Sequence, residues 1–410
     1  MKCNNAVAAL LLRRKGDGST LNLDFTGGSL DPRVVLTRSA ATATYINSSG
    51  YVATAAANEA RFDYDPTTLA AKGLLIEGQG INLVLQSNTL TTTSGNWVSN
   101  SFTQTTPTAV SPTGNSETVS LISGAGSFRS NTVLVTASTT YTFSFWAKNN
   151  GGTKAHYRVW NATAGSSIVD YTSPSASYFS QISDSVWTRI SVSFTTPVGC
   201  TSIYVYPISE DTSGANLYFW GAQLELGTSA SSYIATTTAQ VTRNPDLALM
   251  TSTNFSSWFT GGTTGTFFVD FHGGVRGITS TVRSVISTSD QTTKHLHLQQ
   301  ASAAGVLKVA DFGAAHSVST GNSITSGART KGAFNFDGAT TTVNLCLNGG
   351  TVATSSAIAF SVAPTWLVLG GTSTDGSTLT DLTTVLNGSI RQIKYYPTAL
   401  TSAQLIAMTT

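Results

Sequence analysis

The amino-acid sequence predicts an all-β protein made of two antiparallel β-sandwiches of the jelly-roll type, after a small N-terminal region of irregular and β structure. Charged residues are only 10% of the chain, against about 25% in a typical soluble domain. Ser, Thr, Asn and Gly take their place, and Thr and aromatics favour strands while Gly and Asn favour turns. Apolar residues alternate with period two in several segments. We expect three regions, at residues 1–85, 86–243 and 244–410.

Residues 1–85 have modest apolar content and frequent turn residues, such as Gly27-Gly28 and Asp65-Pro66. They predict short strands and ordered loops packed on a neighbour, because the region alone has too little core. The apolar run at residues 6–12, followed by Arg13-Arg14-Lys15 and Gly16, predicts a short helix that ends at the glycine. A signal peptide is the alternative, but there the basic residues would precede the apolar run.

Residues 86–243 carry the clearest strand signals. In 141–145 the aromatics share one face and the hydroxyls the other, and 190–194 repeat the pattern. The segment 216–225 is apolar on both faces, as a central strand would be. Turn clusters separate these segments, and the spacing predicts an antiparallel jelly roll.

Residues 244–410 predict the second sandwich. Phe267, Val269 and Phe271 share one face of a strand, and Asn348-Gly349 is a hairpin signal. Thr401 and Gln404 have the spacing of a capping box, which predicts a short C-terminal helix.

The cysteines, Cys3, Cys200 and Cys346, lie far apart. They form neither a disulfide framework nor a metal-ligand spacing. Cys346 should face away from Val343 and Leu345, as a small filler or a free thiol. A reducing cytoplasm would tolerate all three cysteines.

The net charge of +2 gives no electrostatic reason to expect a nucleic-acid partner. No segment has the length and hydropathy of a membrane span.

The block from Asp24 to Asn82 contains four short motifs in order: 24–25, 36–45, 61–66, and 73–77 with Asn82-Leu83 at its end. It resembles a block near the start of tailed-bacteriophage virion proteins, ahead of carbohydrate-binding β-sandwich modules. Later segments, 224–227, 233–234 and 241–243, are similar to the same proteins. The resemblance implies that residues 1–85 form a docking region on a virus particle.

The two sandwich regions also resemble known modules. The order of Trp97, 141–148, 187–194 and 218–225 resembles carbohydrate-binding modules of the galactose-binding-like sandwich. Residues 244–410 resemble the laminin-G or concanavalin-like lectin sandwich.

Together these resemblances imply a non-enzymatic protein on the virion surface, as a tail fibre, adhesin, capsid decoration or head fibre. Its implied partners are other virion proteins and host surface glycans. By analogy with phage appendages it would form a homotrimer, assembled in the bacterial host cytoplasm. The alternatives are a glycan-cleaving depolymerase of the tailspike type and a secreted lectin unrelated to phage.

Catalytic residues are not expected. Glycoside hydrolysis usually needs two carboxylates flanking the scissile bond, and the Glu-x-Asp-x-x-Glu motif of related hydrolases is missing. After Glu225 the chain has no glutamate, and the remaining acids resemble turn residues: Asp246, Asp270, Asp290, Asp311, Asp337, Asp375 and Asp381. We read the close pair Glu210-Asp211 as part of a loop.

No metal or other cofactor is expected either. Asp63 and Asp65 could bind calcium through their carboxylates, but a turn role is the simpler interpretation. His295 and His297 would share one face of a strand and could bind zinc with His272. Because structural zinc sites take four ligands, we expect an ordinary solvent-facing pair.

Aromatic residues could stack on sugars, but most aromatics in strands belong to a core. We expect Trp146, Trp187 and Trp220 in the core, because they lie inside strand patterns. The freer candidates are Tyr157, Trp160, Tyr204, Tyr206 and Trp258, and none identifies a glycan site.

Overall fold

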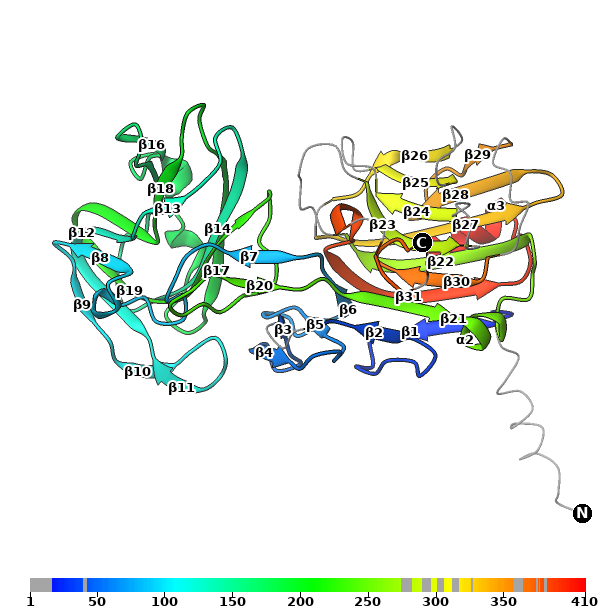
Figure 1. Ribbon diagram of the computed structural model, residues 1–410, viewed down its shortest axis with the longest axis horizontal. Helices are drawn as coiled ribbons and strands as arrows, with labels where there is room; N and C mark the ends of the chain where they lie inside the picture. Colours follow the sequence, from blue (N-terminus) through cyan, green and yellow to red (C-terminus); the bar gives the residue numbers. More distant parts are fainter. Residues whose placement is uncertain are drawn as a thin grey trace, which may run out of the picture.

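A computed structural model describes residues 17–39, 43–273, 282–289, 296–300, 306–311, 317–325, 327–356, 364–373, 375, 377–379 and 382–410. It confirms the all-β class: two antiparallel sandwiches lie side by side in an elongated molecule (Figure 1). The expected N-terminal helix, with its basic run and Cys3, lies outside the described residues, as do Asp290, His295 and Asp381.

The first sandwich is a jelly roll that contains most of residues 83–240. Its larger sheet has the order β17-β14-β19-β12-β8, with β9 also paired to β12, and its smaller sheet has the order β13-β18-β15-β16. A hairpin of β10 and β11 extends from it. The bounds are β8 Trp97–Asn100, β9 Thr103–Thr105, β10 Thr108–Val110, β11 Ser116–Thr118, β12 Ser120–Ser130, β13 Val133–Leu134, β14 Thr140–Asn149, β15 Arg158–Asn161, β16 Ser166–Val169, β17 Thr188–Thr195, β18 Ser202–Tyr206 and β19 Ile208–Leu226.

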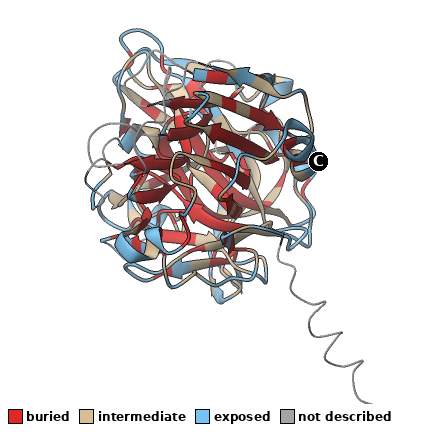
Figure 2. Cartoon of the chain, turned by 90° about the vertical axis from the view of Figure 1, so that its right-hand side faces the viewer, coloured by how far each residue is buried: buried red, intermediate tan, exposed pale blue. Residues whose placement is uncertain are grey.

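The alternation seen in the sequence gives this sandwich its core. Phe143 and Phe145 of β14 pack with Phe219 of β19 and Ile190 of β17. Strand β19 is central, between β14 and β12, as its apolar faces predict. The buried strands occupy the interior of the molecule and the exposed residues lie mainly in the turns (Figure 2).

The second sandwich has an eight-stranded sheet in the order β29-β28-β27-β22-β31-β6-β5, with β1 also paired to β31. Facing it is a seven-stranded sheet in the order β2-β21-β30-β23-β24-β25-β26. The bounds are β1 Leu21–Asp24, β2 Val35–Thr37, β5 Phe62–Tyr64, β6 Ala71–Ile76, β21 Leu247–Thr251, β22 Thr264–His272, β23 Arg283–Ser289, β24 Leu296–Gln300, β25 Val306–Asp311, β26 Ser317–Ser323, β27 Arg329–Asp337, β28 Thr342–Leu347, β29 Ala353–Ser355, β30 Trp366–Leu369 and β31 Gly388–Tyr396.

The strand pairing differs from the expected division at residue 85. Strand β1 pairs with β31 in the register Leu21↔Tyr395, β6 continues along the same strand, and β2 pairs with β21. Leu21 and Leu23 are buried in the core of the second sandwich. The N-terminal strands lack a core of their own, and they gain one by completing both sheets of the C-terminal sandwich.

The jelly roll is therefore inserted into the second sandwich. Strand β7 (Gly80–Asn82) leads into it and β20 (Val241–Arg243) leads out, and the two pair with Asn82 opposite Val241. The hairpin of β3 (Ala43–Ile46) and β4 (Val52–Ala55) lies beside this connection (Figure 1).

Several local predictions in the second sandwich are confirmed. Asn348 and Gly349 both have positive φ, 47° and 68°, as the tight turn between β28 and β29 requires. Helix α3 (Ser402–Thr409) begins with the expected capping box of Thr401 and Gln404. Cys346 is buried beneath this helix, on the opposite face from Leu345. The only other helical segments in the described part are short: α2 (Ser252–Ser256) and four 3₁₀ turns at 92–94, 174–176, 179–181 and 382–384.

Candidate functional site: a cleft between the two sandwiches

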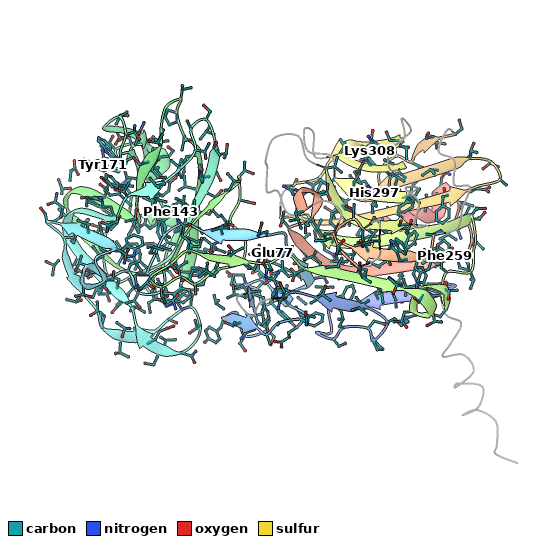
Figure 3. All side chains as sticks on the ribbon, viewed as in Figure 1. Glu77, Phe143, Tyr171, Phe259, His297 and Lys308 are labelled. Atoms are coloured by element: carbon teal, nitrogen blue, oxygen red, sulfur yellow. The ribbon has the colours of Figure 1, made fainter. Side chains whose placement is uncertain are left out.

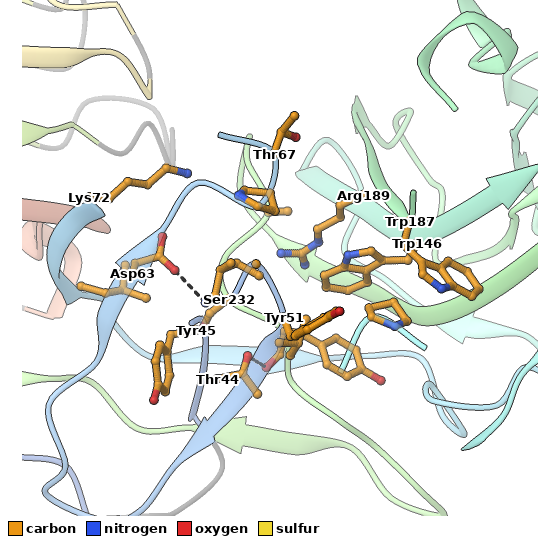
Figure 4. A pocket seen from close by; sticks show the side chains of 18 of the residues that line it. Thr44, Tyr45, Tyr51, Asp63, Thr67, Lys72, Trp146, Trp187, Arg189 and Ser232 are labelled. Carbon is orange, nitrogen blue, oxygen red and sulfur yellow. Dashed lines mark hydrogen bonds between the residues drawn. The ribbon is translucent and has the colours of Figure 1, made fainter. Parts of the chain in front are cut away.

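A cleft of about 720 Å³ lies between the two sandwiches (Figure 4). One wall comes from the hairpin β3–β4 and from β5, β6 and the turn between them. The opposite wall comes from the jelly roll, through the β10–β11 turn, the end of β14 and residues 185–189. The ends of β22 and β31 complete it, so the cleft exists only because three separate parts of the chain meet.

Beneath the cleft is a buried network of opposite charges. The Arg61 guanidinium donates to Glu77 at 2.6 Å and also binds Asp246. Arg38 lies 2.9 Å from the second oxygen of Asp246, and Arg243 lies 3.3 Å from Glu77. These side chains are at most 5% exposed. Burial alone would raise the pKa of Glu77, but Arg243 and Arg61 hold it well below its ordinary range.

The same network joins the jelly roll to the second sandwich. Ser232, at the end of the jelly roll, donates its backbone N–H (2.7 Å) and its hydroxyl (2.6 Å) to Glu77. Arg243 donates to the hydroxyls of Ser231 and Ser232, each at 3.0 Å. Figure 3 shows Glu77 at the junction of the two halves.

The block of residues 24–82 supplies most of this network. Arg38, Arg61 and Glu77 of the block meet Arg243 of β20 within one network. Asn82 closes the block by donating to the carbonyls of Ala222 and Ile234 at 3.1 and 2.8 Å. The motifs therefore hold the two sandwiches of one chain together.

The rim of the cleft is apolar and exposed. Tyr51 is 42% exposed, and Val110 and Val186 are each 52% exposed. The indole N–H of Trp187 donates to the Val110 carbonyl at 2.8 Å, which fixes the ring at the rim. The Tyr51 ring lies against Gly114, where an added Cβ would approach the ring to 2.9 Å.

Cationic side chains also line the cleft. The Arg189 guanidinium stacks 4.5 Å from the centre of the Trp146 ring. The Lys148 ammonium is 5.7 Å from the Trp187 ring and 5.4 Å from the Tyr218 ring. Lys72, on the opposite wall, lies 3.8 Å from Asp65. Burial lowers the pKa of Arg189, while Glu225 and Glu77 act in the opposite direction.

Asp63 and Asp65 have different roles. Asp65 lies in the expected turn, where its carboxylate accepts the N–H groups of Thr67 and Thr68 at 3.0 and 2.8 Å. Asp63 lies in strand β5 instead, lines the cleft, and accepts the N–H of Ile46 at 2.8 Å. Burial raises the pKa of Asp63 from its ordinary 3.8 to about 6.

The histidines do not gather into a site. His272 lines the cleft, where burial, Arg391 and Lys72 lower its pKa. His297 is buried in β24 of the second sandwich (Figure 3), so the expectation that it faces solvent was wrong. Among the described residues, no three His, Cys, Asp or Glu side chains are placed to hold one metal ion.

Two tryptophans lie where the sequence did not place them. Trp258 is 1% exposed and packs against Phe255 and Tyr395, so it is a core residue and not a free aromatic. Trp187 precedes β17 and lines the cleft, so it is not a core residue. The expected core positions of Trp146 and Trp220 are confirmed.

The other aromatic candidates lie on the jelly roll, outside the cleft. Trp160 and Tyr204 are partly exposed on neighbouring strands, whereas Tyr206 is 6% exposed. Arg158 stacks on Trp160 at 4.2 Å and Arg129 on Tyr204 at 3.9 Å. Tyr157 is partly buried and stacks on Tyr178.

Five acidic residues lie in strands and not in the loops or turns that their neighbours suggested: Glu210, Asp211, Asp270, Asp311 and Asp337. Glu210 and Asp211 belong to strand β19, and the Glu210 carboxylate lies 2.7 Å from His156. Asp270 lies in β22 and pairs with Arg329 at 2.6 Å. Asp246 belongs to the buried network.

Sequence reasoning missed Tyr51, Lys72, Lys148 and Arg189 as cleft residues. Tyr51 and Lys72 stand in no motif. Lys148 and Arg189 lie in the segments 141–148 and 187–194, but nothing in those segments shows that the two residues line a cleft. The one local signal was the alternation at 188–194, which placed Arg189 on the face opposite Ile190 without showing what that face meets.

No protein-family model and no curated protein matches the sequence. Among solved structures, similar chains include the CBM40 module of a Ruminococcus gnavus IT-sialidase bound to α2,3-sialyllactose (TM-score 0.31, 20% identity, 36% of this chain and 83% of that chain). Another is a leech intramolecular trans-sialidase (TM-score 0.30, 21% identity, 36% of this chain and 23% of that chain). A third is a heptameric SAP-like pentraxin from Limulus polyphemus (TM-score 0.30, 11% identity, 36% of this chain and 70% of that chain). At these scores the fold assignment rests on the strand pairing of the chain itself.

Proposed function

We propose that this protein binds carbohydrate in the cleft between its sandwiches. The observation that carries the proposal is the combination of an aromatic rim, formed by Tyr51 and Trp187, with a polar and charged interior. Sugars present an apolar C–H face and a ring of hydroxyls, so they need this pairing of surfaces. The volume of about 720 Å³ is in the range of small-molecule sites, about 300–1,000 Å³.

We propose further that the binding is not coupled to catalysis. The Glu77 carboxylate is occupied by Arg61, Arg243 and Ser232. Hydrolysis would need a second carboxyl group to act with Asp63.

A depolymerase is the second candidate function, favoured by one observation. A carboxyl group with a pKa of about 6 in a cleft, as Asp63 has, could act as a general acid near neutral pH. Release of reducing ends from a bound polysaccharide, lost in Asp63→Asn, would replace the binding proposal with this one.

The cellular setting that we propose is the surface of a bacteriophage particle, as a tail fibre, adhesin, capsid decoration or head fibre, in contact with other virion proteins. The resemblance of residues 24–82 supports it. A homotrimer assembled in the host cytoplasm is part of the same proposal. Immunogold labelling of intact particles tests it, and particles without label would contradict it.

A glycan array with the full chain tests the binding site. We expect Trp187→Ala and Tyr51→Ala to weaken binding by about tenfold or more, because aromatic anchors contribute about 2 kcal/mol or more at binding hot spots. The control is Trp160→Ala, because Trp160 is an aromatic residue of the jelly roll that lies outside the cleft. This variant should bind normally. Equal binding by all three variants, with unchanged melting temperatures, would place the site elsewhere.

A further inference from the structure

We propose that the cleft selects saccharides that carry a carboxylate, and that Arg189 and Lys148 bind this group. The inference rests on the proposed carbohydrate binding and names the class of sugar. It follows from a comparison of the cations around the cleft. Some of them contact a carboxylate of the described part of the chain, whereas Arg189 and Lys148 do not.

The hydrogen-bond partners of Arg189 are neutral. Its guanidinium donates to the Ser231 carbonyl at 2.7 Å and to the Ser144 hydroxyl at 3.0 Å. Within the described residues, no carboxylate lies within 4 Å of it, whereas Arg61 and Arg243 below the cleft both contact Glu77. Glu225 and Glu77 act on Arg189 only from a greater distance. A buried charge is costly without an opposite charge. The guanidinium points into the cleft (Figure 4), where a ligand could supply that charge.

Lys148 extends the positive region toward the rim. Its ammonium lies over the Trp187 and Tyr218 rings, and the described part of the chain places no carboxylate within 4 Å of it. A sugar stacked on Trp187 would thus have Lys148 close by and Arg189 deeper in the cleft.

The acidic groups of the cleft do not cancel this charge. Glu77 is already neutralised by Arg61 and Arg243. Asp63 lies with Lys72 on the opposite wall. Because its pKa is raised to about 6, Asp63 carries less than a full charge in mildly acidic solution. The Glu225 carboxylate accepts the N–H and the hydroxyl of Ser231 and is not among the residues that line the cleft. On the side that faces the cleft, the wall formed by Arg189 and Lys148 therefore has positive charge in excess.

A carboxylate suits this wall for geometric reasons. The planar fork of a guanidinium matches the two oxygens of a carboxylate, and such charge-assisted hydrogen bonds are about twice as strong as neutral ones. The remaining N–H groups of Arg189 beside Ser231 and Ser144 can make these bonds, while the aromatic rim holds the sugar ring.

The test is an array printed with uronate- and sialate-terminated oligosaccharides, each beside its own methyl ester, which keeps the sugar and removes the charge. We expect the full chain to bind acids over esters by about tenfold or more. Arg189→Gln and Lys148→Gln should each reduce that preference. Arg158→Gln is the matched control, because Arg158 also stacks on a tryptophan, at 4.2 Å, outside the cleft.

Each outcome separates the two proposals. Equal or tighter binding of the esters, or an unchanged preference in both cleft variants, would overturn the carboxylate inference and leave carbohydrate binding standing. Absence of binding to every acidic and neutral sugar would overturn both. If Arg189→Gln does not fold, Lys148→Gln still tests the carboxylate inference, because Lys148 is partly exposed and its substitution should not disturb the fold.

Discussion

At the scale of single residues, the buried network around Asp246 is the most sensitive part of the molecule. Asp246 accepts from Arg38 and Arg61, and all three side chains are fully buried. We expect Asp246→Asn to lower the free energy of unfolding by about 3–5 kcal/mol, because it leaves two buried guanidinium groups without their partner. Chemical denaturation measures the change.

The control is another Asp–Arg pair on the surface of the same chain. Asp31 and Arg33 lie 2.8 Å apart but are 21% and 31% exposed. Asp31→Asn should cost about 1 kcal/mol or less, because water screens such pairs. A similar decrease in the free energy of unfolding in the two variants would show that the buried network contributes no more to stability than a surface ion pair.

Asp63 predicts a dependence of stability on pH. Its pKa is about 6 in the folded chain and 3.8 as an ordinary aspartate, with Lys72, Glu77 and Arg61 as the charged groups that act on it. Its contribution to stability is complete below about pH 4 and is lost as the pH rises through 6. Asp63→Asn stays neutral, so it should gain about 1–3 kcal/mol relative to the natural chain between pH 4 and 7.

For Asp65 we expect stability to depend on pH in the opposite direction. The N–H groups of Thr68 and Thr67 lower its pKa, so its contribution is present at neutral pH and lost in acid. Asp65→Asn should therefore destabilise the chain most at neutral pH. Melting temperatures of both variants from about pH 2.5 to 7.5 test this, because the contribution of Asp65 is lost only below its ordinary pKa of 3.8. Parallel curves for the two variants would contradict it.

At the scale of elements, the N-terminal strands are parts of the second sandwich. Strands β1 and β6 share the edge of β31, and β2 covers the edge of β21. We expect a fragment of residues 244–410 to lack a cooperative thermal transition, because it would expose both edges and the core beneath Leu21 and Leu23. Circular dichroism during heating measures this, and a sharp transition in the fragment would contradict it.

The same strands show what the sequence could and could not predict. Period-two patterns at 141–145, 190–194 and 267–271 identified strands and their buried faces, because burial on one face of a strand is a local property. The pairing of Leu21 with Tyr395 depends on contacts far apart in the chain, and no local pattern encodes it. The cleft eluded prediction for this reason: Tyr51, Arg189 and His272 come together only when all three regions are paired.

At the scale of the whole molecule, the jelly roll is an insertion with its own core. Its entry and exit strands pair with Asn82 opposite Val241, so a short linker could replace residues 84–239. We expect the shortened chain to keep the second sandwich folded, since its core residues lie outside the deleted segment.

Binding should depend on both halves, because the cleft takes one wall from each. The shortened chain and an isolated jelly roll of residues 83–240 should each be folded, the latter through its separate core. Neither should bind the glycans that the full chain binds, and mixing the two should not restore binding, because the buried joint forms within one chain. Glycan binding by the isolated jelly roll at full strength would show that the cleft is not the site, and that the block of residues 24–82 serves only to hold the sandwiches together.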